Sequence, residues 1–166
     1  MTVKILATSL VFASLAIATA HAQTPVRIDQ FDAWSAYSYK SGDSVSCYIL
    51  STPVTQQPSN VDHGDNFFIV ARPSVGDDLV PEASAGYDLK QGGPMTAMIG
   101  DKTYVMFTKD RHGWLQDEAQ QPAMIQAMKS GAKLELHATS KRGTATSYSY
   151  SLSGITAALK RISVCK

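Results

Sequence analysis

Short runs of apolar and aromatic residues, separated by residues that favour turns, recur along most of this chain. Residues 45–51 form one such run between glycine and proline, and residues 67–71 form another that stops before Pro73. Runs of this length fit strands, whereas helices usually need ten or more residues. Short strands joined by turns, with few helices, predict a mainly β fold, an antiparallel β-sandwich rather than alternating α/β units.

Further strands follow from alternation and from turn chemistry. Two β-prone runs joined by a tight glycine turn predict a hairpin, and strict alternation of apolar and polar residues predicts half-buried strands. The segments assigned in this way are a first strand within 27–39, a hairpin of 95–99 with 103–107, and a second hairpin of 134–138 with 144–152.

Two segments have helical rather than strand-like patterns. Residues 116–129 combine an acidic start, an early proline and a terminal glycine, which are helix start and stop signals. Residues 155–162 place apolar side chains at helical spacing and predict a closing amphipathic helix. Residues 52–65 and 74–94 have loop composition, with one short strand predicted at 87–89. The sandwich therefore carries two short α-helices.

The first 22 residues have the three parts of a secretory signal peptide. Lys4 precedes an uncharged apolar stretch, and Ala20-His21-Ala22 forms a small-x-small cleavage site. The stretch is roughly 16 residues, which is shorter than the roughly 20 that span a bilayer, so a membrane anchor is disfavoured. We expect cleavage after Ala22, a single domain over residues 23–166, and no integral membrane segment after cleavage.

Cys47 and Cys165 are the two cysteines of the chain. An exported protein meets an oxidising compartment in which disulfides form and persist. Two free thiols or a metal site are the alternatives, but two distant sulfurs without convergent histidines make a poor zinc site. The sequence therefore predicts a Cys47–Cys165 disulfide that ties the end of the chain to the early sheet.

Charge excludes two classes of partner. The whole chain has 15 basic and 14 acidic residues, and removal of Lys4 with the signal peptide balances the two signs. Binding to nucleic acid or to anionic membranes needs an excess or a cluster of basic residues. No nucleic-acid partner is predicted, and the oligomeric state is left open.

No catalytic, cofactor-binding or metal site is predicted. The chain lacks a nucleophile elbow, a phosphate-binding loop and a dinucleotide fingerprint. His63 lies in a polar loop of turn-forming residues, His112 in a charged connection, and His137 on the solvent side of its strand. No two of them have a spacing that brings metal ligands together.

One segment has the composition of a contact surface. Lys141 and Arg142 form a basic turn, and Tyr148 and Tyr150 follow on the next strand. Exposed tyrosine beside arginine is typical of interfaces. The alternative, which we favour, is that both tyrosines pack in the core and that the basic pair solvates the hairpin.

The chain also resembles a known family, the invasion-associated locus B proteins. The likeness covers nearly all of the mature chain, from Trp34 and Cys47 to Cys165. Its most specific part is the Ser-Lys-Arg-Gly-Thr turn followed by Tyr-Ser-Leu-Ser-Gly-Ile-Thr-Ala-Ala-Leu. The other segments that carry it are Trp114-Leu115, residues 128–134 and residues 139–146.

The resemblance implies an exported bacterial protein with an immunoglobulin-like β-sandwich and, in some members, a link to host-cell invasion. The resemblance implies no catalytic residues for this chain. We therefore expect a non-enzymatic protein of the periplasm or the extracellular surface that binds a protein partner. The alternative is a periplasmic module that binds a small molecule or a glycan.

Overall fold

The computed structural model describes residues 24–42, 44–73 and 78–165. The predicted signal peptide, residues 1–22, lies outside the described residues. The secondary structure is mostly strand with two α-helices. Its elements are β1 (Val26–Phe31), β2 (Trp34–Ser41), β3 (Ser44–Ser51), β4 (Thr55–Gln57), β5 (Phe67–Arg72), β6 (Val80–Ser84), β7 (Met95–Ile99), β8 (Lys102–Lys109), β9 (His112–Leu115), a 3-10 turn (Glu118–Gln120), α1 (Gln121–Ser130), β10 (Lys133–Thr139), β11 (Ala145–Ser151) and α2 (Ile155–Ser163).

The described strands pair antiparallel in one sheet, in the order β1-β2-β3-β5-β6-β9-β8-β7-β10-β11-β4. The mainly β, antiparallel class and the two helices are confirmed, but hydrogen bonding is continuous rather than divided between two sheets. The joint is the pairing of β6 with β9, in which Glu82 stands opposite Trp114. Neither of these two strands is predicted from the sequence.

The sheet curls so that strands far apart in its order pack against each other. The ring of Phe68 on β5 meets the ring of Tyr150 on β11 with centroids 5.8 Å apart. Trp34 at the start of β2 donates its indole N–H to the carbonyl of Ser151, at 3.0 Å. The enclosed core contains side chains from the inner face of the sheet and from both helices.

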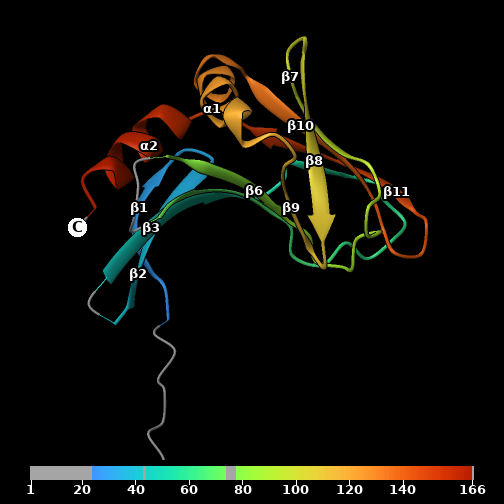
Figure 1. The fold of residues 1–166 in the computed structure, drawn as a ribbon, viewed down its shortest axis with the longest axis horizontal. Coiled ribbons are helices and arrows are strands. Elements are labelled where there is room, and N and C mark those ends of the chain that lie inside the picture. The colour runs from blue at the N-terminus through green and yellow to red at the C-terminus, as the bar shows by residue number, and fades with distance from the viewer. Residues whose placement is uncertain (1–23, 43, 74–77, 166) are drawn as a thin grey trace, which may run out of the picture.

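Both helices lie on the inner side of the curled sheet, above the part that contains β1, β3 and β6 (Figure 1). The buried residues of α2 follow the predicted periodicity and include Ile155, Leu159 and Ile162. Among the described residues, no helix is long and apolar enough to cross a membrane.

One end of the curled sheet, which we call the clamp end, consists of α2, the β1–β2 turn and the Cys47–Cys165 disulfide. The predicted disulfide is present, and its two Cα atoms are 6.3 Å apart. Gly154 precedes α2 with φ of +88°, and a Cβ there would collide with the carbonyl oxygen of Phe31. The close approach of the β1–β2 turn to the start of α2 therefore requires glycine.

Three predictions about strands are corrected by the structure. Residues 27–39 form two strands, β1 and β2, because the chain reverses at Asp32, which adopts φ of +46°. Residues 55–57 form the edge strand β4 within the predicted loop. The predicted strand at residues 87–89 is reduced to one isolated bridge, between Leu89 and Ser140.

Candidate functional site

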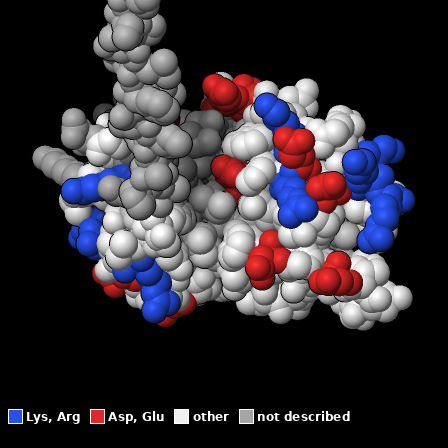
Figure 2. All heavy atoms as spheres, turned by 90° about the horizontal axis from the view of Figure 1, so that it is seen from below, with Lys and Arg blue, Asp and Glu red and all other residues white. Residues whose placement is uncertain are grey.

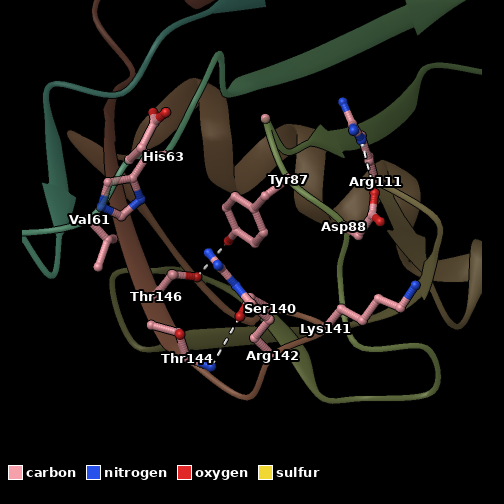
Figure 3. A pocket seen from close by; sticks show the side chains of 12 residues that line it. Val61, His63, Tyr87, Asp88, Arg111, Ser140, Lys141, Arg142, Thr144 and Thr146 are labelled. Carbon is pink, nitrogen blue, oxygen red and sulfur yellow. Dashed lines mark hydrogen bonds and ion pairs between the residues drawn. The ribbon is translucent and has the colours of Figure 1, made fainter.

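A cavity of about 360 Å³ opens at the end of the sheet opposite the clamp end. We call this the cavity end (Figure 3). Its walls come from four connections and from β11. They are the segment before β5 (Val61, Asp62, His63), the segment after β6 (Gly86, Tyr87, Asp88), the β8–β9 turn (Arg111), and the β10–β11 turn with the start of β11 (Ser140, Lys141, Arg142, Thr144, Thr146).

Backbone hydrogen bonds tie the connections around the cavity to one another. The amide of Lys141 donates to the carbonyl of Asp88 at 2.8 Å, and the amide of Ala85 donates to the carbonyl of Arg111 at 2.8 Å. A Cβ on Gly86 would collide with the backbone of His63, so this glycine lets the two connections lie in direct contact. These backbone contacts, which include the isolated bridge between Leu89 and Ser140, hold the cavity walls together.

A chain of hydrogen-bonded side chains runs behind the cavity wall. His63 Nε2 donates to the carbonyl of Pro58, and Nδ1 shares a 2.9 Å hydrogen bond with the Tyr148 hydroxyl. The Tyr148 hydroxyl also bonds the Tyr87 hydroxyl at 2.9 Å, and Tyr87 bonds Thr146 at 2.7 Å. The chain joins the β4–β5 and β6–β7 connections to β11, so it fixes the positions of the hydroxyl groups that line the cavity.

Tyr148 and Tyr150 are neighbours on the inner face of β11 but differ in their partners. Burial raises the pKa of Tyr148, and its hydrogen bond to Tyr87 adds to the increase. Burial also raises the pKa of Tyr150, whose hydroxyl has no hydrogen-bond partner among the described residues. Both phenols therefore remain protonated at neutral pH.

The cavity carries both signs of charge, but its acidic groups are engaged. Asp88 forms an ion pair with Arg111 at 3.1 Å, and Asp62 accepts the amide N–H of Gly64 at 2.9 Å. The side chains of Lys141 and Arg142 have no such partner among the described residues. Figure 2 shows lysine and arginine side chains gathered at the right-hand end of the molecule. Figure 1 has the same horizontal axis and shows the β10–β11 turn at this end.

The predicted contact surface is therefore divided. Lys141 and Arg142 are exposed and line the cavity, whereas Tyr148 and Tyr150 are buried, at 2% and 0% exposure. Two tyrosines two residues apart on a strand point to the same face, and here that face is the core. The exposed-tyrosine interpretation is wrong, and the packing alternative describes both residues.

The histidines take three different positions. His63 lies in the predicted loop before β5, but its ring is buried at 8% exposure and hydrogen-bonded at both nitrogens rather than serving only to form a turn. His112 is part of β9 rather than of a solvated connection, and its Nδ1 lies 2.6 Å from a carboxylate oxygen of Glu82. His137 is exposed on β10, as predicted. Among the described residues, no three potential ligands come together to hold a metal ion.

A second surface, on the outer side of the sheet, was not predicted. Register places Leu50, Ile69, Glu82, Trp114 and Phe107 side by side across β3, β5, β6, β9 and β8. We call these five residues the outer row. The only charge within it, Glu82, is paired with His112, which stacks on Trp114 with centroids 5.6 Å apart. Only the strand register, which the sequence does not reveal, could have identified this row.

The surroundings of the outer row are largely apolar. Phe107 is 46% exposed, Val105 two residues before it on β8 is 50% exposed, and Met98 on the neighbouring β7 is 37% exposed. At the other end of the row, a hollow of about 590 Å³ is lined mainly by apolar and aromatic residues of β2, β3 and β5, and its wall also contains the charged Arg72 and Glu82. Because both helices pack inside the curl, the described residues place no element over this face.

Comparison with known proteins identifies the family. The family model for "Invasion associated locus B (IalB) protein" matches residues 34–163. The crystal structure of invasion associated protein B from Bartonella henselae superimposes with a TM-score of 0.61 at 12% identity, covering 81% of this chain and 92% of that one. A search of curated proteins finds no match. The chain belongs to the invasion-associated locus B family.

Proposed function

We propose that this chain is an exported, non-enzymatic interaction protein of the bacterial envelope or surface, which binds a protein partner through the outer row. The observation that carries the proposal is an aromatic sheet face over which the described part of the chain places no element. Soluble monomers rarely expose large contiguous apolar patches, and those that do generally use them for binding. Because Glu82 is already paired with His112, the face complements an apolar surface rather than a charged one.

Export is the first component of the proposal. The signal peptide over residues 1–22 and the Cys47–Cys165 disulfide both support a compartment outside the cytoplasm. Residues 23–166 then form the mature protein, which we propose to be a single β domain in the periplasm or on the cell surface.

The hydrogen bonding of the two candidate bases, among the residues that the structure describes, supports the non-enzymatic component. Both ring nitrogens of His63 are occupied by hydrogen bonds. Nδ1 of His112 is held by Glu82, as in an oriented general base, but among the described residues no hydrogen bond joins its Nε2 to a hydroxyl or thiol nucleophile, which a serine or cysteine hydrolase would need. We expect the purified mature protein to hydrolyse none of a panel of ester, peptide and glycoside substrates, and an activity that is lost in His112→Gln would contradict the non-enzymatic component.

A role in host-cell invasion is the third component of the proposal. The family name and the Bartonella protein's title both refer to invasion, and we extend this role to the present chain as a proposal. The corresponding test compares attachment to cultured host cells by a deletion strain complemented with wild type or with Phe107→Glu. We expect only the wild-type gene to restore attachment, and equal restoration would contradict the role of the outer row.

Site-specific photo-crosslinking tests the partner-binding claim. A crosslinking residue at Phe107 should yield one discrete adduct in intact cells, whereas the same residue at Val54, 64% exposed before β4, should not. The captured protein, once purified, should bind Phe107→Glu at least about tenfold more weakly than wild type and should bind Val54→Glu normally. Matching adducts at both positions, or an adduct only with a second copy of this chain, would overturn the proposal.

A further inference from the structure

The cavity end has a different chemistry from the outer row, and it points to a different ligand. We propose that the cavity binds an acidic sugar, with a carboxylate held by Arg142 and Lys141 and ring hydroxyls held by the hydroxyl groups of the wall. This inference goes beyond the proposed function, because the site, the ligand and the residues all differ from those of the outer row.

The first observation is the available positive charge. Lys141 and Arg142 line the cavity and have no ion-pair partner among the described residues, while the nearby Arg111 is neutralised by Asp88. In Figure 3 the Arg142 side chain extends towards the part of the cavity where Tyr87 and Thr146 lie. A planar guanidinium can donate two parallel hydrogen bonds to a carboxylate, so Arg142 is the main anchor.

The second observation is the supply of neutral hydrogen-bonding groups beside that charge. Ser140 Oγ accepts the amide N–H of Thr144 at 3.0 Å, which leaves its own hydroxyl proton for a ligand. Thr146 donates to the Ala138 carbonyl at 3.2 Å and bonds Tyr87 at 2.7 Å, and Tyr87 is held from behind by Tyr148, so these two hydroxyls offer a ligand lone pairs that can accept its hydroxyl protons. Hydroxyl groups fixed in this way favour a ligand with several hydroxyls of its own, because little side-chain entropy is lost on binding.

The third observation is size. A cavity of about 360 Å³ lies at the small end of the range for ligand pockets and fits one monosaccharide ring rather than an oligosaccharide. Val61 contributes an apolar patch at 39% exposure, to which a ring face can pack. Charge, hydroxyls and volume together select an acidic monosaccharide over a simple inorganic anion or a neutral sugar.

Titration calorimetry with glucuronate on the mature protein tests the proposal. Glucuronate should bind, while glucose, acetate and inorganic phosphate at the same concentration should bind at least about tenfold more weakly, because each lacks the charge or the hydroxylated ring. No heat from glucuronate, or equal affinity for acetate or phosphate, would overturn the acidic-sugar assignment.

Matched variants locate the site. Arg142→Gln should weaken glucuronate binding about tenfold, as expected for the loss of a charge-assisted hydrogen bond. Lys102→Gln removes an exposed basic residue beside a different hairpin turn and should leave the affinity unchanged. Asp62→Asn keeps the acceptor for Gly64 but removes a negative charge from the cavity, so it should strengthen binding.

The variant results also have a defined negative outcome. Each variant is first shown to have the wild-type melting temperature, so that a change in affinity is not a change in folding. Unchanged glucuronate affinity in Arg142→Gln would overturn the site. Phe107→Glu should retain glucuronate binding, and this separates a failure of the cavity from a failure of the outer row.

Discussion

The clamp end and the cavity end of the curled sheet are held together by different means. At the clamp end, α2 packs into the core and a disulfide joins Cys165 to β3. At the cavity end, the connections are linked by backbone hydrogen bonds and by the series of hydrogen-bonded side chains that runs from His63 to Thr146. The difference indicates that the clamp end supplies stability, while the cavity end keeps polar groups available to a ligand.

The largest effect is expected from opening the disulfide. Cys165→Ser removes a crosslink between residues 118 positions apart, and loss of such a bridge costs about 2 to 5 kcal/mol of unfolding free energy. Chemical denaturation measures the loss. The Cys47→Ser, Cys165→Ser double variant is the control and should be equally destabilised. A loss below about 1 kcal/mol would show that the clamp end does not depend on the bridge.

The next largest effect concerns the glycine before α2. Gly154→Ala adds a methyl group that collides with the Phe31 carbonyl and also carries the strain of a positive φ, so we expect a loss of about 2 to 4 kcal/mol. Gly92→Ala has a similar φ of +64° with open space around it and should cost only about 1 kcal/mol. Thermal unfolding compares the two, and equal losses would mean that the β1–β2 turn moves aside freely.

A third prediction compares the two tyrosines of β11. Tyr148→Phe leaves the buried His63 Nδ1 without its partner and should destabilise the protein by about 1 to 3 kcal/mol. Tyr150→Phe removes a hydroxyl that has no partner among the described residues and should change stability by less than about 0.5 kcal/mol. Urea titration distinguishes them. Equal effects would mean that the hydrogen-bonded chain contributes nothing.

The same tyrosines predict an alkaline limit to stability. Burial raises the pKa of both Tyr148 and Tyr150 above their ordinary value. Above about pH 10 the unfolded chain loses phenolic protons that the native state keeps, so stability is full below that pH and falls as pH rises further. A Tyr148→Phe, Tyr150→Phe double variant should lose less stability between neutral and strongly alkaline pH. An unchanged pH dependence would contradict this origin.

The smallest stability effect is expected at the cavity. Arg142 is exposed and has no partner among the described residues, so Arg142→Gln should change the unfolding free energy by less than about 0.5 kcal/mol. Denaturation of this variant beside Lys102→Gln checks the expectation. A clearly larger loss for Arg142→Gln would show that the cavity end shares the structural role of the clamp end.

These elements differ in how far the sequence reveals them. The β7–β8 hairpin and α2 were predicted because turn chemistry and periodicity are local signals. β6 was missed because Pro81 and Glu82 lower its strand propensity, and its pairing with β9 is long-range. The turn at Asp32 was missed because a non-glycine residue takes a positive φ there.

The candidate site could be predicted only in part from the sequence, because some of its contacts are local and others join residues far apart in the chain. Lys141 and Arg142 were found because they are adjacent in a hairpin turn. His63 was not, because its partner Tyr148 is 85 residues away and only the folded chain brings them together. Whether a tyrosine on β11 faces the core or solvent depends on which side of the sheet is buried, and alternation alone leaves that choice open.

The central claim is that the clamp end stabilises the fold while the cavity end binds the ligand. The glucuronate affinity of Cys165→Ser tests this claim most directly. The measurement is made at a temperature at which the variant is still folded, beside wild type and Arg142→Gln. The account predicts that Cys165→Ser binds within about twofold of wild type despite its lower stability, whereas Arg142→Gln binds about tenfold more weakly. Loss of binding in folded Cys165→Ser as large as that in Arg142→Gln would contradict it.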